Sequence, residues 1–291
     1  MDTEKIRALL KALETGNLGE AADRLGYTHS GMSRMMASLE EETGVRLLNR
    51  SRRGVSPTTE CEELLPAMRG LVQTDEQYRQ IAANLKGLQT GTVRIGNAFY
   101  FMQNVLAKTA KEFSGRYPGI KIELIDAYSS ELAEMLERGN LDICIISRRD
   151  VECDWRPLVD DVMVAWLPED YKLNRKTYPA EKFAEDDFIE ILGEGELDNM
   201  KALHSLGIEP NIKYSVRTDQ SAYAMVAAGL GVTLTNGIYA KYVTSGIRNV
   251  RMDPPCHVEI GIAATPKQLR SLAADKFLEE IYPVCLAEAR K

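Results

Sequence analysis

Residues 21–50 read AADRLGYTHSGMSRMMASLEEETGVRLLNR, which is the pattern of a short helix, a tight turn and a second helix. Gly26 permits a sharp turn because it has no Cβ. After the turn, Met32, Met36 and Leu39 recur at spacings of four and three residues, which keeps one face of a helix buried. A unit of this kind can hold its second helix in the major groove of DNA.

The outer side of that second helix carries the side chains that would meet DNA. Polar residues gather at its N-terminal end and on the face opposite the methionines, where base edges and phosphates would be reached. Thr28 is in addition a good N-cap for the helix. The candidate DNA contacts in this segment are Thr28, His29, Ser30, Ser33 and Arg34.

The next segment, residues 44–56 (GVRLLNRSRRGVS), predicts a strand, a turn and a strand, which is the wing of a winged helix-turn-helix. Four arginines lie in it with no acidic residue between them, namely Arg46, Arg50, Arg52 and Arg53. Guanidinium groups suit phosphate oxygens or a minor groove. We therefore add Arg50, Arg52 and Arg53 to the candidate DNA-binding residues.

At this point the chain resembles the LysR-type transcriptional regulators. The N-terminal pattern of that family has a Gly-Ser-hydrophobic entry, paired alanines, a Ser-Arg pair, a Leu-Glu pair, a Leu-Phe-x-Arg wing and a Thr-x-x-Gly exit. Its elements appear here as Gly16-Asn17-Leu18, Ala21-Ala22, Ser33-Arg34, Leu39-Glu40, Leu47-Leu48-Asn49-Arg50 and Thr58-Thr59-Glu60-Cys61. Three positions depart from the pattern, Asn17 for Ser, Leu48 for Phe and Cys61 for Gly, and all three are variations of packing or turn.

The resemblance extends over essentially the whole chain, and in the second half it rests on the segments YPGIKIELI, RGNLDICI and MVAAGLGVTL. It implies an α/β multidomain fold, in which a winged helix-turn-helix and a long linker helix precede two periplasmic-binding-protein-like lobes with an effector cleft between them. The expected domains are a DNA-binding domain over 1–58, a linker or dimerisation helix with a hinge over 59–90, and an effector-binding domain over 91–291. Lobe one would take about 92–161 and 265–291, and lobe two about 162–264.

The hydrophobic pattern from residue 92 onward agrees with an alternation of strands and helices. Strands at 92–96, 120–125 and 141–146 with helices between them predict a βαβαβ run, whose parallel strands place ligand sites at their carboxyl ends. Further strands are expected at 162–167, 188–192, 214–217, 231–235 and 258–264, the last as the return to the first lobe. A final helix is expected at about 266–287.

Residues 59–88 predict one long helix that begins with a capping box formed by Thr59 and Glu62. A stripe of apolar residues recurs every seven positions along it, at Leu64, Leu71, Tyr78 and Leu85. Such a stripe suits pairing with a second copy, so we expect a homodimer or homotetramer. The alternative is a helix that packs only on its own domain.

The effector site is expected where strand ends meet helix N-termini, because free N–H donors and the helix dipole favour an anion there. A carboxylate or aromatic anion is therefore the expected effector class. The candidate effector-binding residues are Asn97, Phe99, Tyr100, Ser129, Ser130 and Thr218. Ser129 and Ser130 match the hydroxyl-bearing effector loop of the resembled family by position.

Several of these residues have a plainer explanation. Simple helix capping explains Ser129 and Ser130 equally well. Phe99, Tyr100 and Phe101 could stack on a ring-bearing effector or merely fill the cleft, and packing is favoured since aromatic side chains dominate cores. Trp166 has the same two explanations, stacking on an effector or packing in the cleft. Arg148 and Arg149 could pair a carboxylate effector, although adjacent arginines are usually solvated.

The remaining composition excludes several function classes. The 291 residues carry a net charge of −7, with no apolar run near the roughly 20 residues of a membrane span and no signal-peptide pattern, so a cytoplasmic location without a membrane partner is expected. The three histidines and five cysteines form no metal-binding spacing, and no phosphate loop or nucleophile elbow is present. Neither a metal, a cofactor, a catalytic site nor an enzyme is therefore expected. A redox switch through Cys144 and Cys153 is disfavoured because Cys144 belongs to an apolar strand.

Two functions remain. The first is a sequence-specific DNA-binding transcriptional regulator of the LysR type, controlled by a small-molecule effector. The second is a cytoplasmic small-molecule binding protein whose N-terminal helices serve only for dimerisation. The arginine-rich wing favours the first.

Overall fold

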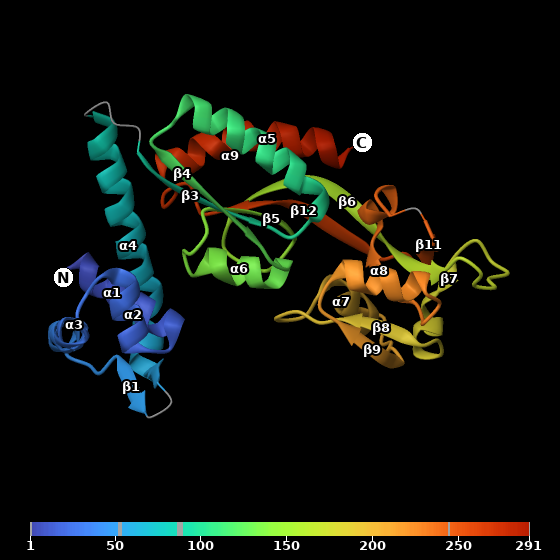
Figure 1. Cartoon of the computed structure of the whole chain (residues 1–291), viewed down its shortest axis with the longest axis horizontal. Coiled ribbons are helices and arrows are strands. Elements are labelled where there is room, and N and C mark those ends of the chain that lie inside the picture. The colour runs from blue at the N-terminus through green and yellow to red at the C-terminus, as the bar shows by residue number, and fades with distance from the viewer. Residues whose placement is uncertain (1, 52–53, 86–89, 244, 291) are drawn as a thin grey trace. The chain divides into compact units, whose positions relative to one another are not determined.

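The computed structural model describes residues 2–51, 54–85, 90–243 and 245–290 (Figure 1). The chain divides into two compact units, one of residues 1–88 with 268–272 and the other of residues 89–267 with 273–291. No helix of the described residues is long and apolar enough to cross a membrane.

The first unit consists of helices and one hairpin. Its elements are α1 (Thr3–Thr15), α2 (Leu18–Leu25), α3 (His29–Thr43), β1 (Leu48–Ser51), β2 (Gly54–Pro57) and α4 (Thr59–Leu85). The strands pair antiparallel, as predicted for a wing. One apolar core joins α1, α2, α3 and the first turns of α4, and Met32, Met36 and Leu39 lie fully inside it. The predicted inward face of the second helix is therefore confirmed.

Local capping explains why α2 and α3 begin and end where they do. Asn17 Oδ1 accepts the backbone N–H of Gly19 at 2.8 Å and so caps α2. Gly26 ends α2 with a φ of 73°, a left-handed conformation that favours glycine. Thr28 Oγ1 then accepts the N–H of Gly31 at 3.1 Å and caps α3, as the sequence predicted.

α4 begins at Thr59 as predicted, but its capping residue differs by one position from the prediction. Thr58, not Thr59, is the capping residue, because its Oγ1 accepts the N–H of Cys61 at 3.1 Å. The same hydroxyl donates to the carbonyl of Arg46 at 2.7 Å, which ties the cap to the segment before the wing. This second bond needs a tertiary neighbour, so local spacing alone pointed to the wrong threonine.

The first lobe of the second unit is a sheet covered on both faces. Its elements are β3 (Gly91–Asn97), η1 (Tyr100–Met102), α5 (Gln103–Arg116), β4 (Ile120–Asp126), α6 (Ser129–Glu137), β5 (Ile143–Ser147), β12 (His257–Ala264) and α9 (Leu272–Ala289). β3 is parallel to β4 and to β5. α5 and α9 lie on one face and α6 on the other (Figure 1). Gly96 lets α6 approach β3, since a Cβ there would lie 2.7 Å from Leu132 Cδ2.

The second lobe is reached through one long strand, β6 (Asp154–Pro168). Its first half pairs with β12, and its second half pairs with strands of the second lobe. The other elements of this lobe are β7 (Tyr178–Pro179), η2 (Ala180–Ala184), β8 (Phe188–Ile191), α7 (Asp198–Ser205), β9 (Ile212–Val216), α8 (Asp219–Ala227), β10 (Thr233–Asn236), η3 (Gly237–Lys241) and β11 (Ile247–Asp253). The order β4-β3-β5-β12-β6-β11-β7 makes a sheet that runs through both lobes.

Two details of the expected second half need correction. β12 pairs with β5 from Ile260 to Ala264, which confirms that the chain returns to the first lobe at the strand expected over 258–264, so the bound of 264 expected for lobe two is too late. The last helix begins at Leu272, later than the expected 266. Apolar periodicity continues through the approach to this helix and so gave no sharp start.

Candidate functional site

The outer face of α3 presents a polar N-terminal end. Thr28, His29, Ser30 and Arg34 are exposed and Ser33 is half-buried. Thr28 Oγ1 lies 3.3 Å from Ser30 Oγ, and Arg34 Nε donates to the carbonyl of Ser30 at 3.3 Å. All five predicted contacts of this segment are thus brought together on one turn and a half of helix.

The arginines of this unit fall into two groups. Three arginines on α1, α2 and α4 pair with acids: Arg7 with Asp75, Arg24 with Glu20 and Arg79 with Glu4. Arg34 on α3 and Arg50 on β1 are exposed, and neither has an acidic partner among the residues that the structure describes. Arg52 and Arg53, at the tip of the wing, lie outside the described residues.

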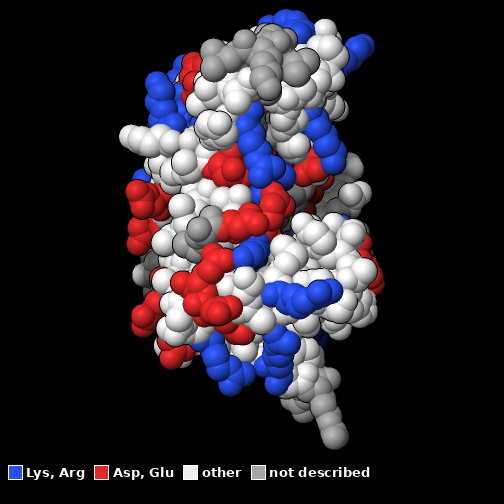
Figure 2. All heavy atoms as spheres, turned by 90° about the vertical axis from the view of Figure 1, so that its left-hand side faces the viewer, with Lys and Arg blue, Asp and Glu red and all other residues white. Residues whose placement is uncertain are grey.

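Figure 2 shows how charge is distributed on this side of the molecule. Asp and Glu side chains spread over the middle of the view, and Lys and Arg side chains lie at its upper end, between the acids and at its lower end, where Figure 1 draws β1 at the same level. Some of the positive charge on this face thus lies at the level of the wing.

Glu40 fixes the wing to the helix. Its Oε1 accepts the backbone N–H groups of Leu47 at 2.8 Å and Leu48 at 3.2 Å. A carboxylate that accepts two backbone donors makes charge-assisted hydrogen bonds, which are stronger than neutral ones. The strand with Arg50 is therefore held in a defined orientation relative to α3.

The long helix α4 exposes apolar side chains beyond its packed N-terminal part. Leu71 is 43% exposed, Tyr78 70% and Ile81 48%. Leu64, the first member of the predicted stripe, is half-buried against the core, and the side chain of Leu85 lies outside the described residues.

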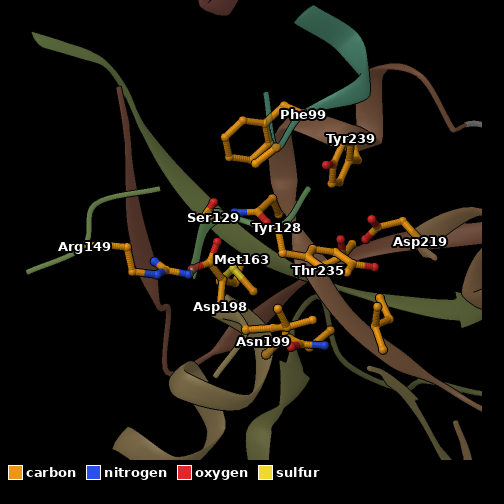
Figure 3. A pocket seen from close by; sticks show the side chains of 15 residues that line it. Phe99, Tyr128, Ser129, Arg149, Met163, Asp198, Asn199, Asp219, Thr235 and Tyr239 are labelled. Carbon is orange, nitrogen blue, oxygen red and sulfur yellow. The ribbon is translucent and has the colours of Figure 1, made fainter. Parts of the chain in front are cut away.

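A small cavity of about 40 Å³ lies in the second unit, beyond the carboxyl ends of β3 and β5 (Figure 3). Phe99 and Ser129 line it from the first lobe, and Asp198, Asp219 and Tyr239 line it from the second. The sequence predicted a ligand site at these strand ends, and the cavity places residues of both lobes around such a position.

Arg149 and Asp198 join the two lobes inside this cavity. Arg149 Nη2 donates to Asp198 Oδ1 at 2.7 Å, and both side chains are 13% exposed. Ser147 Oγ also donates to Asp198 Oδ1, at 2.9 Å, and accepts from Arg149 Nη1 at 2.8 Å. Figure 3 shows the guanidinium directed at this carboxylate. Arg148, by contrast, is exposed and covers the ring of Trp155 at 4.7 Å.

Asn97 does not reach the cavity. It is buried, its Nδ2 donates to the carbonyl of Phe99 at 2.9 Å, and its Oδ1 accepts the N–H of Phe99 at 3.2 Å. Nδ2 lies 3.4 Å from Asp126 Oδ1 as well. The side chain therefore shapes the turn after β3, and its contact with an effector stays a prediction.

Neither serine of the predicted effector loop caps α6. Ser129 is buried and its Oγ accepts the N–H of Ser147 at 3.0 Å, which links α6 to the end of β5. Ser130 Oγ donates to the carbonyl of Glu194 in the second lobe. The capping residue is Tyr128, whose own N–H donates to Glu131 Oε2 at 3.3 Å. The sequence predicted either helix capping or hydroxyl groups free to bind an effector. It did not predict that Ser129 and Ser130 form these hydrogen bonds to other parts of the domain.

The aromatic residues after β3 pack, and one of them also lines a second cavity. Phe99 and Phe101 are buried, whereas Tyr100 is partly exposed and stacks on Tyr239 with ring centroids 4.8 Å apart. The second cavity, of about 450 Å³, is lined by Tyr100, Trp166, Thr218, Asp219, Gln220, Tyr223, Tyr242, Val243 and Ser245. Thr218 caps α8, because its Oγ1 accepts the N–H of Ser221 at 3.1 Å.

Asp219 lines both cavities, and nothing in the sequence marked it beyond its place after Thr218. Burial raises the pKa of the Asp219 carboxyl, and the charge of Asp198 raises it further. Burial and the nearby Asp219 in turn raise the pKa values of Tyr100 and Tyr128 to about 12. Both acids are the first residues of their helices, so the protein's own carboxylates occupy the helix N-termini that suggested an anion.

The cysteines give no support for a redox switch. Cys144 is fully buried and burial raises its pKa, while burial also raises the pKa of Cys153. A raised pKa keeps a thiol protonated and unreactive. Among the described residues no group of three or more His, Cys, Asp or Glu side chains could hold a metal ion.

Comparison with known proteins agrees with the arrangement of both units. Residues 3–62 match the family of bacterial regulatory helix-turn-helix proteins of the lysR family, and residues 86–285 match the LysR substrate binding domain. The chain is 24% identical to the uncharacterized HTH-type transcriptional regulator YvbU of Bacillus subtilis, over 96% of this chain and 97% of that protein. It is 26% identical to the probable HTH-type transcriptional regulator LrrA of Synechococcus elongatus, over 96% of each.

Among solved structures, a full-length OxyR variant from Pseudomonas aeruginosa has a TM-score of 0.71 and 18% sequence identity, with 98% of this chain and 94% of that chain covered. This likeness shows a common fold. Regulators of the matched family bind DNA and small-molecule effectors and form oligomers. The chain belongs to the LysR family and is a transcriptional regulator with an N-terminal helix-turn-helix DNA-binding domain and a C-terminal effector-binding domain.

Proposed function

We propose that this regulator reads a specific DNA sequence through the side chains Thr28, His29, Ser30, Ser33 and Arg34, with Arg50, Arg52 and Arg53 of the wing on the phosphates. The observation that carries this proposal is the contrast among arginines. Arg34 and Arg50 have no acidic partner among the described residues, whereas Arg7, Arg24 and Arg79 on the other helices are paired. An exposed guanidinium without a protein partner is available for guanine or phosphate.

The proposed working form is an oligomer held through α4, with a DNA-binding domain over 1–58, the linker helix over 59–90 and the effector domain over 91–291. The exposed Leu71, Tyr78 and Ile81 support this proposal, because an apolar helix face in water usually has a partner. Two copies would present two recognition helices to related half-sites. A DNA target in turn favours a cytoplasmic location.

A small-molecule effector is proposed to bind between the lobes, near Phe99, Tyr100, Ser129, Ser130 and Thr218. Aromatic side chains at this place support the expectation that the effector carries a ring or another apolar part. The negative charge expected for it has less support, since Arg149 is already paired and Asp219 is close by. A ligand that changes how the lobes meet would change the equilibrium between two states of the regulator.

In vitro selection from a random DNA pool tests this function. We expect the full chain to enrich duplexes that share one sequence with two related halves. The alternative, a small-molecule binding protein whose N-terminal helices only dimerise, predicts that no sequence is enriched. Selection at one fixed salt concentration is needed because phosphate contacts are salt-dependent.

A further inference from the structure

The second cavity has an unusual lining for an anion site. Four aromatic residues, Tyr100, Trp166, Tyr223 and Tyr242, surround it together with Asp219. No lysine or arginine is among its described lining residues. Its volume of about 450 Å³ is within the range of small-ligand pockets.

Two of the three tyrosines bind other parts of the protein with their hydroxyl groups. Tyr223 Oη donates to the carbonyl of Ser245 at 2.7 Å, and Tyr242 Oη donates to Glu288 Oε1 at 3.3 Å. One face of Tyr100 is covered by Tyr239 at 4.8 Å, and the ring is still 39% exposed. What these residues offer to a ligand is therefore mainly the faces and edges of their rings. Ring faces carry the negative part of the aromatic quadrupole and attract cations.

Asp219 adds a full negative charge to the same lining. No side chain among the described residues makes an ion pair with it, whereas Asp198, the other acid of the cleft, is paired with Arg149 at 2.7 Å. Figure 3 shows the Asp219 carboxylate beside Tyr239, far from the guanidinium of Arg149. A half-buried carboxylate without a cation is costly for the protein alone, and a bound cation would offset that cost.

Trp166 adds an almost fully buried aromatic ring to the cavity. The side chain is 1% exposed, lines the cavity, and its indole Nε1 has no hydrogen-bond partner among the described residues. Buried donors are normally satisfied. This donor is itself buried from water, so Trp166 contributes its ring, and not its Nε1, to the lining of the cavity.

We propose that the cavity between Tyr100, Trp166, Tyr223 and Tyr242 binds an organic cation, whose ammonium group lies against the ring faces and the Asp219 carboxylate. This inference rests on the proposed effector site and names the chemical class of its ligand. A carboxylate ligand would meet Asp219 without a free cation among the described lining residues.

The test uses the full chain with Trp155→Phe, so that Trp166 is the sole indole. Benzyltrimethylammonium, benzyl alcohol and benzoate are titrated at constant ionic strength up to about 10 mM, and Trp166 fluorescence is recorded. We expect saturable binding of benzyltrimethylammonium, at least about tenfold tighter than that of the neutral and anionic probes. Equal or tighter binding of benzoate overturns the proposal, and so does the absence of a saturable response to the cation.

Matched variants assign the binding to these residues. Asp219→Asn is expected to weaken the binding of benzyltrimethylammonium about tenfold or more. Asp170→Asn removes an exposed carboxylate away from the cavity and should leave the affinity for benzyltrimethylammonium unchanged. Tyr100→Ala should weaken binding and Tyr100→Phe should retain it, because phenylalanine keeps the ring face. An unchanged affinity in Asp219→Asn contradicts the assignment. Binding of each preparation to the selected DNA duplex is measured in parallel, so that a protein that binds its DNA but no cation refutes this inference alone.

Discussion

Arg149 and Asp198 form an ion pair of 2.7 Å between the two lobes of the effector domain, and each side chain is 13% exposed. The pair neutralises Arg149, the one arginine among the described residues that line the first cavity. It also connects the end of β5 with the start of α7, so the relative position of the lobes depends on it. The positive charge of Arg149 is therefore already balanced by Asp198 within the protein, before any effector binds.

Breaking this pair should destabilise the effector domain. Asp198→Asn leaves Arg149 largely buried without its counter-charge, and we expect a loss of about 2–4 kcal/mol in the free energy of unfolding, measured by urea titration. The control is Asp187→Asn, which breaks the exposed Asp187–Lys213 pair and should cost less than about 1 kcal/mol. Equal losses of stability in the two variants would mean that the Arg149–Asp198 pair contributes no more than an exposed ion pair.

The recognition helix gives the second prediction. Arg34→Ala should weaken binding to the selected duplex by about 1–3 kcal/mol and leave the fold intact. Arg24→Ala removes an exposed arginine that is already paired with Glu20 on α2 and should have a much smaller effect. Fluorescence anisotropy at one salt concentration measures both. If the two variants bind alike, Arg34 contacts neither a base nor an important phosphate.

Much of this surface could be predicted from the sequence because it depends on local rules. Gly26 and Thr28 set the turn between α2 and α3 through their own backbone geometry and hydrogen bonds, and methionine spacing set the buried face. The role of Glu40 could not be predicted in this way. Its partners Leu47 and Leu48 lie beyond the end of the helix, and only the folded chain brings their N–H groups to the carboxylate.

The link between α3 and the wing gives the third prediction. Glu40→Ala leaves two backbone donors without their acceptor, so we expect a loss of about 1–3 kcal/mol in stability of the DNA-binding domain and weaker DNA binding. Glu41→Ala, an exposed neighbour, is the matched control. Thermal unfolding and anisotropy titration distinguish the two effects. Wild-type values for Glu40→Ala in both would show that the wing does not need this carboxylate.

The exposed stripe of α4 gives the fourth prediction. Leu71→Glu places a charge in the proposed interface, where it has no partner, and the protein should lose its oligomers in light scattering together with its affinity for the selected duplex. Leu206→Glu changes an exposed leucine of the effector domain in the same way and should keep the oligomer. An oligomer that survives Leu71→Glu would place the interface elsewhere.

The effector cleft shows where reasoning from sequence reaches its limit. Strand ends and helix starts could be located from hydrophobic pattern, which is why Ser129 and Thr218 fall near the cavities. The hydrogen bonds of those residues depend on the other lobe or on a neighbouring strand, as for Ser130 with Glu194 and Ser129 with Ser147. The charge of the cleft depends on the fact that Asp198, and not Asp219, is paired with Arg149. The spacing of these residues along the chain does not reveal which acid forms the pair.

The raised pKa of Asp219 gives the fifth prediction. Folding favours the protonated carboxyl, so this group contributes stability at pH values below its ordinary pKa of 3.8, and the contribution is lost as the pH rises through the raised value. Asp198, Tyr100, Tyr128 and Tyr239 are the titratable groups that interact with it. Asp219→Asn should therefore gain stability relative to wild type as the pH increases from 4 toward 7, in urea unfolding without ligand. A constant difference over this range would contradict the prediction.

The most direct test of the central claim compares the affinity of the full chain for the selected duplex and for a duplex of the same composition in scrambled order. A sequence-specific regulator should prefer the selected duplex by about 10³-fold or more at physiological salt. A ratio near one would mean that the exposed arginines bind DNA without reading its sequence, and would contradict the account.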